Sequence, residues 1–225
     1  IGPRSELIPL LKHDSVAVSW AANEVILDIA NDVSVPGREA DRATVARQLL
    51  DALAATEVQT EQFTLLRILP IVIPEGADLS AIDALLYRDN TKERARRALQ
   101  EGNTPEARAA LRKALPKADA TFACALMDAL DKMGDTEAIP LIANNLAQGT
   151  PAEQAAAARA LAPTGDPAYR EPFLALAREI DVNHRFAVED AVLRLADAMA
   201  VNGGAWDASM ALFRAILKQS ENPVI

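Results

Sequence analysis

The two histidines are the first residues to consider for metal chemistry in this 225-residue sequence, because imidazole is a common metal ligand. A metal site needs two or three His, Cys or carboxylate ligands at short helical spacing. Neither His13 nor His184 has another histidine within one helical turn. We interpret His13 as a surface residue in a turn and His184 as a polar residue in the first turn of a helix. The sequence therefore predicts no metal site and no cofactor.

Cys124 and a group of carboxylates are the remaining candidates for catalysis. A nucleophilic cysteine needs a nearby base, and no histidine is near Cys124 in the sequence. We expect Cys124 to pack in the core as a small apolar residue. Asp128, Asp131 and Asp135 share a helix face, where a carboxylate pair does acid–base work if one member is buried. A solvated face is the simpler interpretation, so no catalytic residue is predicted.

A basic segment is the local feature that favours binding. Residues 88–117 contain nine Lys and Arg side chains against four Asp and Glu, whereas the whole chain has a net charge of −9. Charge is therefore segregated along the sequence. We predict that four arginines of this segment bind an acidic partner: Arg94, Arg97, Arg108 and Arg112. The alternative is a solvated face on which pairs such as Glu93 with Arg97 neutralise the arginines.

A fixed interval of 31 residues indicates which elements position these side chains. Four tripeptides recur at this interval: Arg97-Ala98-Leu99, Asp128-Ala129-Leu130, Arg159-Ala160-Leu161 and Asp190-Ala191-Val192. Such a period predicts one supersecondary unit stacked on copies of itself. Alanine is abundant and runs of β-branched or aromatic residues are few, so each unit is predicted to be an antiparallel helix hairpin. One hairpin cannot bury both faces, and its neighbours must cover it.

Turn residues separate the predicted helices. Thr150-Pro151 is a typical helix start, with a capping hydroxyl followed by a proline whose missing N–H costs nothing there. Gly134-Asp135 and Gly165-Asp166 are equivalent helix ends, 31 residues apart. Pro140 and Pro172 fall early in the helices that follow. A proline inside a helix removes a hydrogen bond and kinks the axis, so we expect a built-in bend of the outer helix.

This pattern of Gly-Asp, a following proline, Thr-Pro and an alanine-rich helix resembles the short bacterial HEAT repeats, most clearly over residues 78–200. The resemblance implies an all-α fold, an α-α superhelix (solenoid) of about six to seven antiparallel helix hairpins. We predict a single array over residues 1–225, with degenerate repeats in 1–77, regular repeats in 78–200 and a capping helix in 201–225. Trp20 and Trp206 are expected to cover the end repeats or to pack against sequence outside this chain.

Composition excludes some classes of function. A chain with a pI near 4.8 is a poor general binder of nucleic acid, which attracts proteins chiefly through Lys and Arg. The apolar stretches are far shorter than a membrane span. A single cysteine excludes an internal disulfide and does not identify a compartment. A cytoplasmic protein and an exported protein whose signal has been removed both remain open.

From these observations we predict that the protein is not an enzyme but a non-catalytic scaffold, which presents a concave helical surface to a protein or peptide partner. One alternative is a structural or spacer segment of a larger, exported bacterial protein, which a first residue other than Met favours. Another is a HEAT-like enzyme such as a lyase or a DNA glycosylase. The sequence has no His-Glu dipeptide to bind iron, and it is too acidic for a DNA-binding groove.

Overall fold

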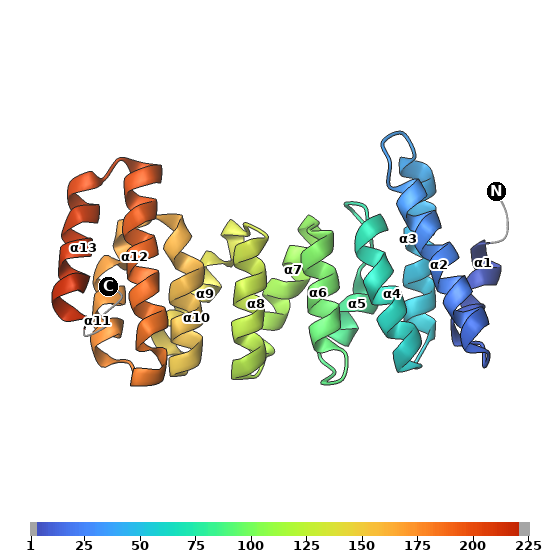
Figure 1. Ribbon diagram of the computed structural model, residues 1–225, viewed down its shortest axis with the longest axis horizontal. Coiled ribbons are helices and arrows are strands. Elements are labelled where there is room, and N and C mark those ends of the chain that lie inside the picture. The colour runs from blue at the N-terminus through green and yellow to red at the C-terminus, as the bar shows by residue number, and fades with distance from the viewer. Residues whose placement is uncertain (1–3, 221–225) are drawn as a thin grey trace. The chain divides into compact units, whose positions relative to one another are not determined.

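The protein is built from α-helices joined by short turns and 3-10 helices (Figure 1). The computed structural model describes residues 4–220, and no β-strand occurs among them. The chain divides into two compact units between Ala114 and Leu115. Within each unit the helices pair as antiparallel hairpins that stack side by side. The predicted fold class, all-α with stacked helix hairpins, is therefore confirmed.

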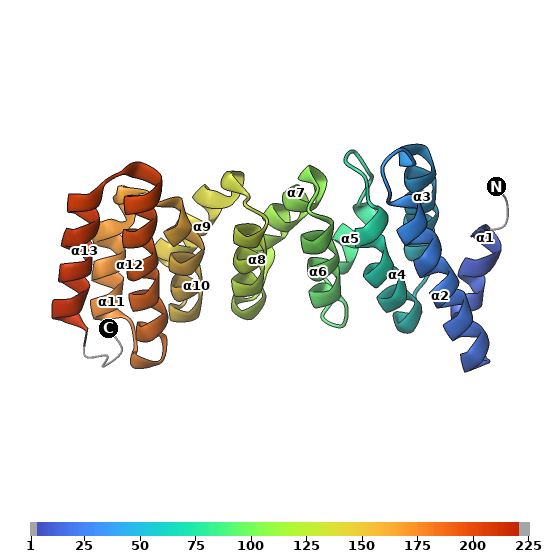
Figure 2. The same ribbon diagram turned by 45° about the horizontal axis from the view of Figure 1, so that its top comes forward.

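The first unit has two rows of helices. Helices α2, α4 and α6 lie side by side in one row, and α3, α5 and α7 form the other (Figures 1 and 2). Its elements are α1 (Arg4–Leu7), a 3-10 helix (Ile8–Lys12), α2 (Val16–Val33), α3 (Glu39–Ala55), α4 (Gln59–Val72), α5 (Ser80–Leu85), α6 (Lys92–Gly102) and α7 (Pro105–Ala114). The rows arise because each hairpin contributes its first helix to one row and its second helix to the other.

Side-chain contacts in the first unit repeat the interval found in the sequence. Arg42 of α3 donates from Nε to the carbonyl oxygen of Val72 at 3.1 Å, and from Nη2 to that of Ile73 at 2.8 Å. Other contacts also join residues 30 or 31 positions apart: Gln59 with Asn90, Arg88 with Glu57, and Lys113 with Asp83. Each contact ties a helix or turn to its equivalent in the next hairpin. The sequence interval is thus the repeat of the stack.

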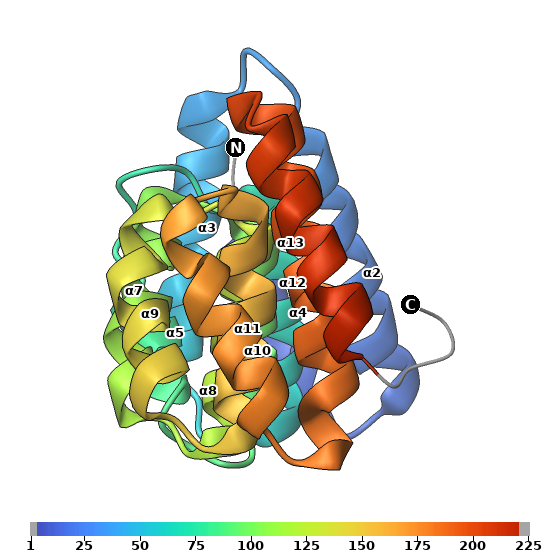
Figure 3. The same cartoon turned by 90° about the vertical axis from the view of Figure 1, so that its left-hand side faces the viewer.

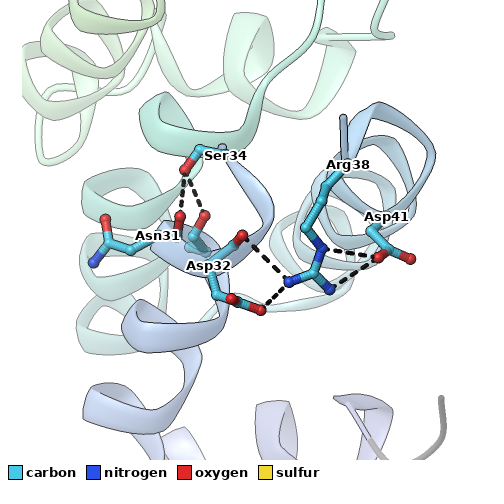
Figure 4. A network of polar contacts seen from close by, with 6 residues as sticks. Asn31, Asp32, Ser34, Arg38 and Asp41 are labelled. Atoms are coloured by element: carbon cyan, nitrogen blue, oxygen red, sulfur yellow. Dashed lines mark hydrogen bonds and ion pairs between the residues drawn. The ribbon is translucent and has the colours of Figure 1, made fainter. Parts of the chain in front are cut away.

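Arg38 holds the turn between α2 and α3 (Figure 4). Its guanidinium bridges the two helices, because Nη1 contacts the Asp32 carboxylate and Nη2 donates to Asp41 at 2.9 Å. The Ser34 hydroxyl donates to the carbonyl oxygen of Ala30 at 2.8 Å and so satisfies a carbonyl at the end of α2. Side-chain hydrogen bonds therefore fix the angle at which the chain enters α3.

The second unit also stacks its hairpins in rows, with α8, α10 and α12 side by side (Figure 1). Helix α13 packs on α12 and α11 at the edge of this unit (Figure 3). The helices are α8 (Ala120–Lys132), α9 (Ile139–Gln148), α10 (Pro151–Leu161), α11 (Arg170–Glu179), α12 (Val182–Gly203) and α13 (Trp206–Gln219), with short 3-10 helices at Leu115–Lys117, Thr136–Ala138, Ala162–Thr164 and Pro167–Tyr169. Alanines 155–158 and 160 are buried in α10, which lets its neighbours approach closely.

Helix starts follow the sequence signals. Thr150 accepts from the backbone N–H of Glu153, and the Glu153 carboxylate accepts from the Thr150 N–H at 2.8 Å, which together form a capping box. The Thr104 hydroxyl caps α7 by accepting from the N–H of Ala107 at 3.2 Å. Asp119 caps α8 in the same way. These side chains satisfy N–H groups that have no partner within their helix.

Two of the prolines lie in the first turns of their helices. Pro140 is the second residue of α9, and Pro172 is the third residue of α11. A 3-10 helix precedes each of these α-helices. A proline in the first turn loses no intrahelical hydrogen bond, so it needs no kink. The outer element is therefore a 3-10 helix followed by a short α-helix with its proline in the first turn, and the expected bend stays a prediction.

The tryptophans differ from expectation. The side chains of Trp20 and Trp206 are 66% and 65% exposed, so neither covers the core of an end repeat. Each lies on a helix whose opposite face is packed in its own unit. The prediction of one continuous array over residues 1–225 stays a prediction, since each of the two compact units has its own core.

Candidate partner-binding site

Two of the four predicted arginines line one groove of the first unit. The groove lies between α4 and α6, has a volume of about 190 Å³ and is lined by Phe63, Leu66, Arg67, Arg94, Arg97, Ala98 and Glu101. We call it the arginine groove. It holds three guanidinium groups and a single carboxylate. Its floor is apolar because Leu66 and Ala98 are buried between the two helices.

Arg94 is held by an aromatic ring of the neighbouring helix. Its guanidinium carbon lies 3.9 Å from the centre of the Phe63 ring. A cation over a ring face is attracted by the ring quadrupole. This stacking orients the plane of the guanidinium but uses none of its five N–H donors. Arg94 is therefore positioned in advance for a ligand that accepts hydrogen bonds.

Arg67 and Arg97 have weaker constraints. Arg67 donates from Nη2 to Asn23 Oδ1 at 2.7 Å. Arg97 donates from Nε to Glu101 Oε1 at 2.7 Å, and its side chain is 75% exposed. The Glu101 carboxylate raises the pKa of Arg97 above its ordinary value, so this guanidinium is charged at every relevant pH. An exposed pair of this kind contributes little to stability and exchanges readily for another carboxylate.

The other two predicted arginines lie elsewhere. Arg108 and Arg112 are on α7, in the second row of helices, and neither lines the arginine groove. Arg108 donates from Nε to Asn103 Oδ1 at 3.1 Å. Both side chains are half-buried. The structure thus brings Arg94 and Arg97 together and does not join them with Arg108 and Arg112.

Much of the remaining positive charge of residues 88–117 is paired. Four of its basic residues form ion pairs: Arg88–Glu57, Lys92–Asp89, Arg96–Glu93 and Lys113–Asp83. Glu57 and Asp83 come from outside the segment, so the surface excess is smaller than the sequence indicates. Glu93 pairs with Arg96 at 3.0 Å and not with Arg97, the pair that we named for the alternative of a solvated face. Carboxylates therefore neutralise most of the basic side chains of this segment. The arginine groove is the exception, because its guanidinium groups outnumber its carboxylates.

Sequence reasoning missed Phe63 and Arg67, which complete the groove from α4. Phe63 stands 31 positions before Arg94, so the two residues occupy equivalent places in adjacent hairpins. The same interval that predicted the fold would have placed the ring beside the guanidinium. Arg67 has no such signal, because its equivalent in the next hairpin is the buried Ala98.

His184 lies in the first turn of α12 and His13 is an exposed residue in the turn before α2, as expected. The Nδ1 of His13 accepts from the N–H of Ser15 at 3.0 Å, at the beginning of α2. The Nδ1 of His184 lies 2.8 Å from the Asp181 carboxylate that caps α12. The contact with His184 lowers the pKa of Asp181. Among residues 4–220, no group of three or more His, Cys, Asp and Glu is placed to hold a metal ion.

Cys124 and Asp131 are half-buried on α8. Burial raises the pKa of the Cys124 thiol, and the nearby Glu153 raises it further, whereas Arg159 opposes the shift. We expected Cys124 in the core, and it lies at its margin. Burial and the neighbouring Asp128 raise the pKa of Asp131. We expected the carboxylates of this helix to lie on a solvated face, and the half-buried Asp131 does not.

No protein-family model and no curated protein matches the chain. Among solved structures, the chain is similar to one in "the complex of CpcE and CpcF of phycocyanin lyase" from Nostoc sp.. The two chains are 18% identical with a TM-score of 0.44, and the match covers 98% of this chain and 96% of that one.

This match contradicts two expectations. We expected a non-catalytic scaffold and a protein that is not an enzyme, yet the similar chain belongs to a lyase. The physical reason for the error is that an architecture of stacked helix hairpins does not determine whether a protein catalyses a reaction. The absence of a recognisable catalytic motif therefore does not exclude catalysis on this architecture.

Among residues 4–220, no helix is both long and apolar enough to cross a membrane.

Proposed function

We propose that the protein binds an acidic segment of a partner protein in the arginine groove. The observation that carries this proposal is the stacking of Arg94 on Phe63, with Arg97 and Arg67 lining the same groove. Three guanidinium groups face one carboxylate there, in a chain whose overall charge is −9. A planar guanidinium binds a carboxylate through two parallel hydrogen bonds, which favours Asp and Glu side chains.

The size of the groove supports a protein segment over a small molecule. Its volume of about 190 Å³ is below the roughly 300–1,000 Å³ of typical small-molecule pockets. It accommodates one or two carboxylate side chains and leaves the rest of a ligand outside. The partner is therefore a chain that runs along α4 and α6 and places successive acidic side chains in the groove.

We further propose that residues 1–225 form one HEAT-like array of the short bacterial type. The recurrence of contacts at 30 or 31 residues in the first unit supports this proposal, as does the same interval in the sequence of the second. In such an array Arg108 and Arg112 would supply a separate contact for the same partner.

The binding proposal is tested with a fluorescein-labelled peptide of about six glutamates and its glutamine counterpart. We expect the glutamate peptide alone to bind, and the double variant Arg94→Gln, Arg97→Gln to weaken binding about tenfold or more. The matched control is Arg47→Gln with Arg194→Gln, which removes the same charge from exposed arginines outside the groove. Equal weakening by both double variants, with unchanged helicity, would contradict a specific site.

Glu101 provides an independent arm of this test. Its carboxylate occupies the Nε donor of Arg97, so a bound peptide must displace it. Glu101→Gln is expected to strengthen peptide binding about threefold, because it frees Arg97 and raises the net positive charge. Binding that weakens in this variant would mean that peptide carboxylates do not reach Arg97.

A further inference from the structure

Helix α13 is apolar on two sides. One side is packed in the second unit, where Leu212 and Ile216 are fully buried. The Ser209 hydroxyl on this side donates to the Ala196 carbonyl oxygen of α12 at 2.6 Å. Near the end of the helix, Gln219 Nε2 donates to the Leu174 carbonyl oxygen of α11 at 3.2 Å. These contacts fix the rotation of α13 about its own axis.

The second apolar side is exposed. Trp206, Met210 and Leu217 are 65%, 47% and 55% exposed, and Phe213 between them is half-buried. The four residues follow one another at spacings of four, three and four, which is the spacing of a coiled-coil seam. At 100° per residue they fall within a sector of about 60°. We call this row the α13 seam. The helix that carries it, α13, lies at the edge of the second unit (Figure 3).

The flank of the seam carries charges in a definite order. Asp207 lies in the first turn of α13, and Arg214 and Lys218 lie in the last two turns. All three side chains are exposed and project to the same side of the seam, away from the packed face. None of them forms a hydrogen bond or an ion pair with any other residue in 4–220. One acid at the start of the flank is thus matched by two bases at its end.

We propose that the α13 seam binds the α13 seam of a second copy of this chain, antiparallel, about a two-fold axis. In antiparallel helix pairs the same flank of each helix meets its equivalent in reverse order. A two-fold axis at the middle of the seam places Asp207 of one copy between Arg214 and Lys218 of the other, about 3 Å along the helix from each. The flank is therefore complementary to itself.

The same charges disfavour other arrangements of two copies. A parallel pair would set the flank of one helix against the packed face of the other, where no complementary charges are available. An isologous antiparallel contact uses each ion pair twice, because the symmetry repeats it. Phe213 and Met210 of both copies lie at the centre of the shared seam, and Trp206 of each copy adds a large apolar side chain at one end. A second copy thus satisfies the exposed apolar row and its charges together.

The experiment measures mass by sedimentation velocity from about 1 to about 200 µM chain. We expect a shift from the 24.1 kDa monomer to a dimer within this range. The double variant Met210→Glu, Leu217→Glu is expected to weaken association at least 30-fold, roughly 2 kcal/mol, with an unchanged circular dichroism spectrum. The control is Val201→Glu, which changes an even more exposed apolar side chain on α12, outside the seam.

Charge exchange tests the antiparallel arrangement. Asp207→Lys makes the flank entirely positive and is expected to weaken dimerisation about tenfold. Adding Arg214→Asp and Lys218→Asp reverses every charge, so that the triple variant is again self-complementary and regains the affinity of the original chain. The proposal is overturned by a monomer at all concentrations, by a dimer that survives the double glutamate variant, or by a triple variant that remains as weak as Asp207→Lys.

Discussion

Asp131 is a half-buried carboxylate whose pKa is raised by burial first and by Asp128 second, against the opposing charges of Arg194, Lys132 and Arg159. A raised pKa in the folded state means that the fold binds the proton more tightly than the unfolded chain does. Stability therefore falls as pH rises from the ordinary aspartate pKa through the raised one.

We predict that Asp131→Asn raises the melting temperature at pH 7 and leaves it nearly unchanged at about pH 3, where Asp131 is protonated. The neutral amide removes the cost of a half-buried charge. Thermal unfolding followed by circular dichroism at both pH values measures the difference. Asp197→Asn, at an exposed position of α12, is the control and should change neither value. A variant that is less stable at pH 7 would show that attraction to Arg159 and Arg194 outweighs burial.

Cys124 gives a second prediction at this scale. Its thiol has a raised pKa, and the thiolate is the species that reacts with alkylating reagents. At about pH 7.5 we expect iodoacetamide to react several-fold more slowly with the folded protein than with the urea-unfolded chain.

Glu153→Gln should accelerate this alkylation, because it removes a negative charge near Cys124 while an amide at this position can still serve the cap on Thr150. Glu171→Gln, at an exposed position of α11, should have no effect. Equal rates for Glu153→Gln and the original chain would mean that burial alone shifts the pKa.

Individual residues were partly predictable from sequence. Arg94 and Arg97 were chosen because they lie three apart on one helix, and that spacing does place them in one groove. The role of Phe63 depends on a contact between hairpins, which the 31-residue interval implies but charge counting does not consider. The half-burial of Asp131 depends on how closely α8, α10 and α12 pack. Side-chain volumes set that distance, so no local pattern reveals it.

At the scale of elements, Gly134 and Gly165 end helices in equivalent repeats with the same φ of +65°. They differ in their surroundings. A Cβ on Gly165 would lie 2.9 Å from the carbonyl oxygen of Ala198 in α12, whereas a Cβ on Gly134 would meet nothing within 4 Å. The two glycines therefore separate the cost of a left-handed backbone from the cost of close packing.

We predict that Gly134→Ala costs about 1 kcal/mol of unfolding free energy, for the left-handed conformation alone. Gly165→Ala should cost about 3 kcal/mol or more, because the loop and α12 must also move apart. Urea unfolding of both variants gives the comparison. Equal costs would mean that the turn at Gly165 shifts freely away from α12.

The elements themselves were largely predictable. Thr150, Asp119 and the glycines mark starts and ends by local chemistry, and local chemistry is visible in sequence. The position of the two prolines within their helices was not predictable, because one residue type fits two structures. A proline kinks a helix from its interior but begins one from its first turn, and the position of the first turn is set by the preceding 3-10 helix. The sequence did not reveal that the α13 seam is exposed. A row of apolar residues on a helix normally predicts a buried face, and the sequence does not show which element covers it.

At the scale of the whole molecule, the 31-residue period predicted stacked units, because each repeat needs a neighbour to cover its apolar face. With the abundance of alanine, the same period predicted the all-α class. It did not predict function, because catalysis depends on a few side chains and not on the stack. Stacked hairpins do make one prediction about stability. Because each helix packs chiefly on neighbours within its own compact unit, damage should spread locally and not through the whole chain.

Hydrogen exchange measured by mass spectrometry tests this prediction with one substitution in each unit. Gly165→Ala opens the contact between its loop and α12, so the amides of α10, α11 and α12 should exchange faster while those of α3 and α4 keep their protection. Arg42→Ala removes two hydrogen bonds from a charged donor to Val72 and Ile73, at a cost of about 1.5–3 kcal/mol. It should deprotect α3 and α4 and spare α10 to α12. If either variant accelerates exchange equally in both units, the chain opens as one cooperative block. The two units on either side of Ala114 would then not unfold independently.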